Sequence, residues 1–438
     1  MKPVLESSLR KDISRRHFVA ASATAGTIPN SMLANSNDAA IGPVLGHIDE
    51  SSLFCFIRPP RKGEVRLKLT DLTIGKVAAT VSAQAKSEND LCTRFELKGL
   101  IPGHDYHGEF FDTSGQQLFS GAEFRTQTPK EAVEKDFSII GLGSCISSTK
   151  FNEIWKQIAA QKIEAFCLLG DSPYIDHSAL SRNRDARRKF WGTLPALGAL
   201  AKSIPFWNTW DDHDFGRNYS DGRVIGKENI RQAFMEYSAL ANYGEQGEGI
   251  YTKFRRGPVE VWMIDGRWFS QTNPSWADPD RPTCLGQTQW EWLKRTIKKS
   301  TAPFKLLCTG MVWYPKGNRE KDHWETYAVE RDALFAFIKR EKISGVILMS
   351  GDIHVSRHHD YGNERLGYPL HECVVSPMHE RIIPSLDVKH PAKVWSLPAP
   401  NVFLKVEATS KKLTATWINM MGKEIYSFSV ESKALSRI

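Results

Sequence analysis

The 438-residue sequence lacks any long hydrophobic run, and no segment approaches the roughly 18 uninterrupted apolar residues that a transmembrane helix needs. No transmembrane segment is therefore predicted. Internal repeats and low-complexity tracts are also missing, which excludes a solenoid or an extended disordered chain. With 41% hydrophobic and 25% charged residues, the composition is that of a globular protein large enough for two or three domains.

Cysteine is scarce, and its spacing excludes a common kind of metal site. The seven cysteines contain no Cys-x-x-Cys pair, so a structural zinc knuckle is not expected. Cys55 and Cys92 lie in strand-like segments where a disulfide between them remains an alternative to two free thiols. An odd number leaves at least one thiol unpaired, and Cys145 is the candidate.

The sequence also lacks a continuous basic tract, although its formal net charge is +8. Five cationic residues against two acids place +3 of this charge in the first 34 residues, so about +5 remains for the rest. There, lysine and arginine alternate with acidic residues. This pattern favours a small anionic substrate and gives no reason to expect a specific nucleic-acid partner.

The N-terminus resembles a twin-arginine export signal. Ser14-Arg15-Arg16-His17-Phe18 is followed by a weakly apolar stretch from Val19 to Ile28 and by small residues near Ala34. The alternative is a terminal tail with two chance arginines. Because the three regions follow the right order, we expect residues 1–38 to be a signal peptide. The twin-arginine export machinery would then be a partner, and the protein would be periplasmic or secreted.

Two folded regions are expected after this segment. Residues 40–128 contain short β-type runs between Pro, Gly, Asn and Asp, and Leu97–Tyr106 resembles the tyrosine corner of a fibronectin III-like sandwich. Residues 136–438 alternate strand and helix patterns, which predicts a layered α/β domain with a mixed sheet. Within this second region, residues 229–243 are predicted to be helical.

Four short segments of the second region carry metal-type ligands where a predicted strand ends. They are Gly143-Ser144-Cys145, Gly170-Asp171-Ser172-Pro173-Tyr174, Trp210-Asp211-Asp212-His213-Asp214 and Ser350-Gly351-Asp352-Ile353-His354. Ligands of α/β domains gather at the carboxyl ends of strands, where loops aim side chains at one point. One such segment would be a weak signal, but four are hard to explain by packing.

The segments differ in strength. Three acids and a histidine at 211–214 would repel one another unless cations compensate, and a buried strand leads into them. Asp352 and His354 point the same way in extended geometry, so both can reach one ion. Taken alone, Asp171 is better explained as an N-cap or turn residue, and Cys145 as a small buried residue. His358 and His359 are interpreted as loop or surface histidines.

Together the segments resemble the PhoD-like alkaline phosphatases, a branch of the calcineurin-like metallophosphoesterases. The family patterns Gly-Ser-Cys, Leu-Gly-Asp-x-x-Tyr and Ser-Gly-Asp-x-His are met in full, and Trp-Asp-Asp-His-Glu is met with Asp214 for Glu. Pro173 is a departure that reshapes the loop before Tyr174. The resemblance implies a four-layer metallophosphoesterase-type α/β sandwich over residues 136–438, beside the N-terminal fibronectin III-like all-β sandwich.

The resemblance further implies a ferric iron beside a calcium ion, with other divalent cations as alternatives to calcium. The implied iron ligands are Cys145, Asp171, Tyr174, Asp352 and His354, with Asp171 as the bridge. The implied ligands of the second cation are Asp211, Asp212 and Asn218.

Further roles follow from the same resemblance. His213 would face the phosphate or the leaving group, oriented by Asp214, and Arg267 would support the phosphate or a nearby acid. Trp324 and Tyr327 would contact the substrate.

The expected function is an exported metal-dependent phosphatase or phosphodiesterase that acts on a small phosphate ester through metal-activated water. One alternative is a phospholipase D-like phosphodiesterase that acts on lipid or wall-polymer head groups. Another is a non-catalytic protein that binds a surface polymer through its β-sandwich. The presence of every required ligand type argues against the second alternative.

Overall fold

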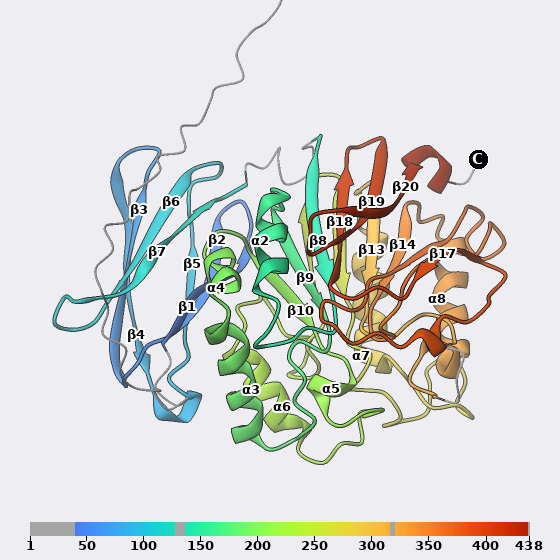
Figure 1. Ribbon diagram of the computed structural model, residues 1–438, viewed down its shortest axis with the longest axis horizontal. Coiled ribbons are helices and arrows are strands. Elements are labelled where there is room, and N and C mark those ends of the chain that lie inside the picture. Colours follow the sequence, from blue (N-terminus) through green and yellow to red (C-terminus); the bar gives the residue numbers. More distant parts are fainter. Residues whose placement is uncertain (1–39, 128–135, 316–319, 437–438) are drawn as a thin grey trace, which may run out of the picture. The chain divides into compact units, whose positions relative to one another are not determined.

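A computed structural model of the chain describes residues 40–127, 136–315 and 320–436 (Figure 1). Residues 1–38, which carry the predicted export signal, lie outside the described residues. The described residues belong to one compact unit. Within the described residues, no helix is long and apolar enough to cross a membrane.

The first seven strands form two antiparallel sheets, ordered β1-β2-β5 and β4-β3-β6-β7. Their bounds are β1 Ile41–Ile48, β2 Ser52–Arg58, β3 Gly63–Asp71, β4 Lys76–Ala85, β5 Thr93–Lys98, β6 Asp105–Phe111 and β7 Gln117–Arg125. Along β3, Val65, Leu67 and Leu69 alternate with exposed or half-buried residues and join the core of this region. The Tyr106 hydroxyl accepts a hydrogen bond from the Ile101 backbone N at 2.8 Å, so the predicted tyrosine corner is confirmed.

The remaining strands form two further sheets. The six-stranded sheet has the order β10-β9-β8-β18-β19-β20, and the seven-stranded sheet has the order β11-β12-β13-β14-β16-β15-β17. Strands of the first are β8 Ser138–Gly143, β9 Ala165–Leu169, β10 Phe206–Thr209, β18 Val402–Ala408, β19 Lys412–Asn419 and β20 Glu424–Glu431. Strands of the second are β11 Thr252–Arg256, β12 Val259–Met263, β13 Phe304–Cys308, β14 Val346–Ser350, β15 Ser356–Asp360, β16 His371–Val374 and β17 Lys393–Leu397.

The described residues also contain seven α-helices. They are α2 Asn152–Ala160, α3 Leu180–Thr193, α4 Pro195–Ala201, α5 Asp212–Phe215, α6 Lys227–Glu236, α7 Gly286–Lys298 and α8 Ala328–Arg340. Short 3-10 helices are η2 Ser87–Asn89, η3 Trp324–Tyr327, η4 Pro384–Leu386 and η5 Ser432–Leu435. Helix α6 ends seven residues before the predicted end at residue 243. The chain turns away there because the Ala239 carbonyl accepts a hydrogen bond from His47 N of β1 at 2.8 Å.

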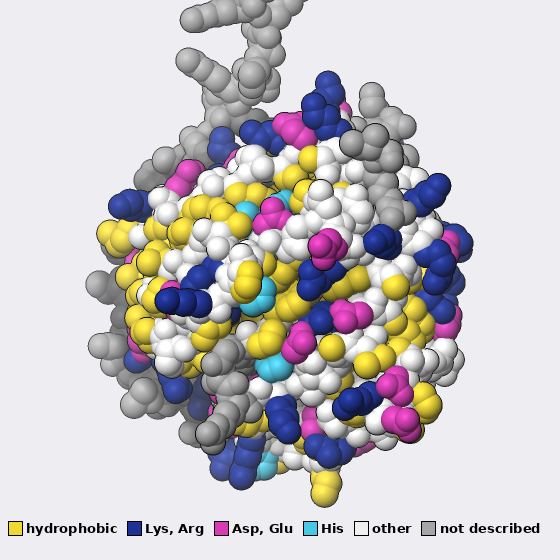
Figure 2. All heavy atoms as spheres, turned by 90° about the vertical axis from the view of Figure 1, so that its right-hand side faces the viewer, with side chains coloured by type: hydrophobic (Ala, Val, Ile, Leu, Met, Phe, Trp, Pro, Cys, Tyr) yellow, Lys and Arg dark blue, Asp and Glu magenta, His cyan; other side chains and the backbone are white. Residues whose placement is uncertain are grey.

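Side chains of the six-stranded sheet alternate between two hydrophobic cores. In β9, Phe166 and Leu168 pack with residues of α2, α3 and α4, whereas Cys167 and Leu169 face the core shared with the seven-stranded sheet. That second core also receives apolar residues of α7 and α8. The succession of helices, sheet, sheet and helices gives four layers, as the family resemblance implied, with two sheets where the strand–helix pattern alone indicated one mixed sheet (Figure 1). From the side of β17 and α8, basic and acidic side chains alternate on the surface (Figure 2).

All seven cysteines are free and buried. The alternative of a disulfide between Cys55 and Cys92 is therefore wrong for this structure. Cys55 packs in the core of the N-terminal sheets, whereas Cys92 packs in the core around α2, α3 and α4.

The interpretation of His358 and His359 as surface residues is also wrong, because both are buried in β15. His358 stacks on Phe428 with the ring centroids 4.0 Å apart, and its Nδ1 lies 2.9 Å from the Tyr426 hydroxyl. Its Nε2 lies 3.2 Å from His371 Nδ1. Protonating both histidines in one apolar enclosure would bring two positive charges together and cost free energy. Burial lowers the pKa of His358 to about 3, and the nearby His371 lowers it further.

This histidine pair predicts a loss of stability in acid. The unfolded chain binds a proton at His358 near pH 6.5, whereas the folded chain does so only near pH 3, so stability falls as the pH is lowered between these values. We expect a loss on the order of 3 kcal/mol between pH 6.5 and pH 4 from this group. Urea unfolding of His358→Gln at both pH values should show a smaller loss, whereas the more exposed His107→Gln should behave like the wild type. An equal loss in all three proteins would contradict the assignment.

Candidate metal centre

The four segments singled out in the sequence follow β8, β9 and β10, which are neighbours in the six-stranded sheet, and β14 of the seven-stranded sheet. The structure brings their side chains into three groups whose ligand atoms lie within 4.8 Å of one another. The groups are Cys145, Asp171 and His354; Asp171, Asp212 and His213; and Asp211, Asp212 and Asp352. Asp171 and Asp212 each occur in two groups, so the three groups form one continuous centre.

The backbone at this centre is held in unusual conformations. Four residues have backbone φ values in the left-handed region that residues with a Cβ rarely adopt. They are Cys145 (54°), Asp171 (50°), Asp352 (69°) and His354 (54°). Next to Asp171, Gly170 has φ 88°, and a Cβ there would lie 2.5 Å from Asp211 Cβ. The glycine therefore permits the close approach of the loops after β9 and β10.

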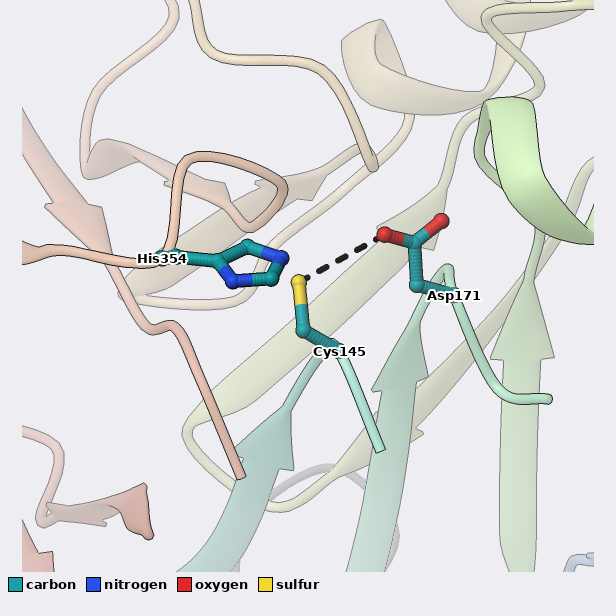
Figure 3. A group of neighbouring side chains, drawn as sticks. All are labelled: Cys145, Asp171 and His354. Atoms are coloured by element: carbon teal, nitrogen blue, oxygen red, sulfur yellow. Dashed lines mark hydrogen bonds between the residues drawn. The ribbon is translucent and has the colours of Figure 1, made fainter. Parts of the chain in front are cut away.

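The first group lies between the loops after β8, β9 and β14 (Figure 3). Cys145 Sγ lies 3.5 Å from Asp171 Oδ2, and His354 points toward both from the opposite side. His354 Nδ1 lies 2.8 Å from the Arg381 carbonyl, which leaves Nε2 toward the centre, 3.0 Å from the Tyr174 hydroxyl. A backbone acceptor on one imidazole nitrogen is the usual way to fix the ring of a metal-binding histidine.

The second part of the centre is built by the short helix α5. Asp211 is the N-cap of this helix, and Asp212 accepts a hydrogen bond from the Tyr219 backbone N at 2.8 Å. Asp211 is bound by Arg267, whose Nε donates to Asp211 Oδ1 at 2.7 Å. Arg267 is 2% exposed, so it neutralises a buried acid, one of the two roles expected for it.

Burial and mutual repulsion dominate the electrostatics. Burial raises the pKa of Asp171 well above the ordinary value, and the charges of Cys145 and Asp212 raise it further. Burial also raises the pKa of Asp214 to about 7 and that of the Cys145 thiol to about 11. Asp171 Oδ1 is buried and has no hydrogen-bond partner among the described residues.

These observations fit a bound pair of cations. A buried carboxylate oxygen without a donor is costly, and a cation supplies the missing partner. The donor set combines a thiol, a phenol and an imidazole on one side with carboxylates on the other. Soft and aromatic donors suit a transition metal, whereas carboxylates suit a hard cation.

The predicted role of Asp214 in orienting His213 is corrected by the structure. Asp214 is residue N3 of α5, and in the capping box its carboxylate points back to the Asp211 backbone N. Its other oxygen accepts from the Ser172 backbone N at 3.4 Å. His213 instead has its Nδ1 2.6 Å from Asp176 Oδ1.

Three further residues with predicted roles, Trp324, Tyr327 and Asn218, lie in three different environments. Trp324 is wholly buried and stacks on Trp313, with ring centroids 4.4 Å apart and planes 9° apart, so the expected contact with substrate is wrong. Tyr327, three residues later, lines a pocket beside Arg267. Asn218 is exposed in the loop after α5, and its role as a ligand remains a prediction.

The sequence reasoning missed two residues at the centre. Asp176 holds His213, and the signal available for it was its place two residues after Tyr174 in an acidic strand-end loop. His379 is 7% exposed, and its Nε2 lies 3.2 Å from the Tyr174 hydroxyl. No spacing pattern pointed to His379, because it reaches the centre from the segment after β16.

The chain matches known proteins over this region. Residues 142–408, more than half of the chain, match the family model of the PhoD-like phosphatases. Alkaline phosphatase D of Bacillus subtilis (strain 168) is 27% identical over 337 residues, which cover 64% of this chain and 56% of that protein. This chain thus matches only a little more than half the length of that relative.

Two solved structures show the same fold. The structure of PhoD has a TM-score of 0.76 at 17% identity and covers 94% of this chain and 93% of that one. Purple acid phosphatase PPD1 from yellow lupin (Lupinus luteus) seeds has a TM-score of 0.65 at 14% identity, over 90% of this chain and 74% of that one. The expected metallophosphoesterase-type α/β sandwich with an N-terminal all-β region, and the family resemblance, are thereby confirmed.

Proposed function

Since this chain belongs to the PhoD-like phosphatase family, we propose that it is a metal-dependent hydrolase of phosphate esters. The observation that carries the proposal is the convergence of Cys145, Asp171, Asp212, Asp352 and His354 at the ends of neighbouring strands. Packing alone gives no reason to bury these groups together, because their mutual repulsion costs stability. A hydrolytic centre for an anionic substrate gives that reason.

The residues divide into two ligand sets. Cys145, Asp171, Tyr174, Asp352 and His354 would hold ferric iron, and Asp171, Asp212 and Asn218 would hold calcium. Asp211 accepts a hydrogen bond from Arg267 and lies in one group with Asp212 and Asp352, so it would add negative charge for the second ion. When bound, the two ions supply Lewis acidity toward the phosphate oxygens and an acidified water at neutral pH.

The remaining side chains act on the ester itself. In hydrolysis the phosphorus–oxygen bond to the alcohol breaks, an oxygen from water joins phosphorus, and the alcohol oxygen takes up a proton. His213 is held at Nδ1 by Asp176, so its Nε2 edge is available for the leaving oxygen or a phosphate oxygen. The ring centroid of Tyr174 lies 4.9 Å from that of His213 and limits its rotation.

Metal removal tests the proposal directly. We expect dialysis against a chelator to abolish hydrolysis of both mono- and diesters, because the charge of the transition state would no longer be neutralised. Restoring defined iron and calcium should recover activity together with a visible phenolate-to-iron absorption band. Metal analysis of the protein as purified provides the control. Full activity in the metal-free protein, or a protein without iron and without this band, would contradict the assignment of ions.

Export and domain organisation belong to the same proposal. Residues 1–38 would be a twin-arginine signal, residues 40–128 a fibronectin III-like domain and residues 136–438 the phosphatase domain, with periplasmic or secreted localisation. Support comes from the order of basic, apolar and small residues before Ala34. Arg15→Lys/Arg16→Lys should retain the protein in the cytoplasm, as cell fractionation would show. Unchanged export would contradict the twin-arginine route.

A further inference from the structure

A pocket of about 620 Å³ opens beside the acidic half of the candidate metal centre. Two residues of its wall connect it to that centre. Arg267 donates to Asp211, and the backbone N of Tyr219 donates to Asp212 Oδ2 at 2.8 Å. The volume lies within the range of small-ligand pockets, so the pocket has room for the organic part of a phosphate ester.

The charges in the pocket wall are balanced. Three cationic side chains, those of Arg223, Arg267 and Lys321, face three carboxylates. Arg223 forms a two-point ion pair with Asp221, at 2.9 and 2.6 Å, and Arg267 lies 3.5 Å from Asp322. Because the wall carries three charges of each sign, the pocket offers no net surplus of one sign to a second charged group of the substrate.

The other wall residues are neutral and polar. Gln271, Thr326, Tyr219 and Tyr327 contribute an amide and three hydroxyl groups. Gln271 Nε2 donates a hydrogen bond to the Tyr327 hydroxyl at 3.1 Å. This bond fixes the orientation of the amide, whose carbonyl oxygen can then accept a hydrogen bond from a ligand. Amide, carboxylate and hydroxyl groups beside aromatic faces suit a ligand with several hydroxyl groups on an apolar ring.

We propose that this pocket binds the alcohol part of the substrate, and that this part is a neutral, polyhydroxylated ring of the sugar type. The inference rests on the proposed function, since it deepens the substrate class of that centre. A second pocket of about 330 Å³ borders Tyr174, His354 and His379 from the other side and includes Ser148. Because its volume also lies within the range of small-ligand pockets, Ser148→Ala tests this second pocket.

Two esters that differ only in ring hydroxyl groups test the proposal. Glucose 6-phosphate and cyclohexylmethyl phosphate have similar leaving groups, so their ratio of kcat/KM reports recognition of the hydroxyl groups. We expect the wild-type chain to prefer glucose 6-phosphate. Gln271→Leu and, independently, Thr326→Val should each lower this preference roughly tenfold, because both side chains are half-buried polar groups that lose a partner when the ligand lacks a hydroxyl group. Gln287→Leu, on the exposed side of α7, is the matched control.

A binding measurement separates this inference from the proposed function. Saturation-transfer NMR with methyl α-glucopyranoside should show binding to the full chain as purified, and weaker binding to Gln271→Leu. If neither ester is hydrolysed but this binding pattern is found, the proposed function fails and the sugar site stands. The sugar site would be overturned if the wild type preferred cyclohexylmethyl phosphate, or if neither Gln271→Leu nor Thr326→Val lowered the preference for glucose 6-phosphate. It would also be overturned if only Ser148→Ala lowered that preference.

Discussion

Replacing Asp171 by asparagine is expected to lower kcat/KM for every phosphate ester more than ~10³-fold. Asp171 is the residue shared by the thiol-containing group and the group with Asp212 and His213, so its loss affects both proposed ions. An amide is a poor bridging ligand, since it has no charge and only one oxygen. Steady-state kinetics and metal analysis of the variant should show both losses. Asp280→Asn, at an exposed position, serves as the matched control.

The same substitution has an opposite expected effect on stability. Without metal, the Asp171 carboxyl is buried against other acids, and its raised pKa marks a cost to the folded state. The neutral amide of Asp171→Asn would remove that cost, so the metal-free variant should be more stable than the metal-free wild type by about 1–3 kcal/mol. Urea unfolding after chelation measures the difference. Lower stability together with lost activity would indicate a structural role for Asp171 and would contradict the metal assignment.

Arg267→Met should destabilise the protein by about 3–5 kcal/mol, because it leaves the buried carboxylate of Asp211 without its cation. Arg267 is fully enclosed, and its Nη1 also donates to the Ser220 carbonyl at 3.0 Å. Burial acts to lower the pKa of Arg267, but the nearby charges of Asp211, Asp212 and Asp322 raise it well above the ordinary value. The site therefore strongly favours a cation here. Urea unfolding of the protein as purified is the measurement.

A double-mutant cycle identifies the source of this loss. Asp211→Asn removes the carboxylate that Arg267 neutralises, so Asp211→Asn/Arg267→Met should be more stable than Arg267→Met alone. Strict additivity would mean that the loss comes from packing of the arginine stem. Arg223→Met is the matched control, since its partner Asp221 is paired at the surface and a change below about 1 kcal/mol is expected.

The clustering of these side chains was predictable from the sequence because each segment with a proposed ligand follows an apolar strand. Strands such as Ala165–Leu169 and Val346–Ser350 are buried throughout and are therefore nearly continuous apolar runs in the sequence. The glycine and the acid that follow each run mark the end of the strand. The order of strands in a sheet is not written in such a run. The four-layer arrangement was expected from the family resemblance, but the order of the strands within the two sheets came only from the structure.

The errors at the centre have a common physical cause. Asp214 is the next residue after His213 in the sequence, whereas Asp176 is close to it only in space. Because the capping box of α5 turns the Asp214 carboxylate back to the Asp211 backbone, Asp176 is the acid that faces the His213 ring. Trp324 and Tyr327 are the first and last residues of η3 and both are buried, but Trp324 stacks on Trp313 whereas Tyr327 also lines the pocket. Such choices depend on side-chain direction, which residue patterns do not specify.

The left-handed backbone at Cys145, Asp171, Asp352 and His354 has an evolutionary consequence. Glycine adopts this conformation without the strain that the present side chains carry, and it has no charge to bury. A gene copy released from selection for function would gain stability by mutation to glycine at these positions, and it would lose its proposed metal ligands long before its fold. Inactive descendants of such a chain should thus be recognisable by glycines where the ligands once stood.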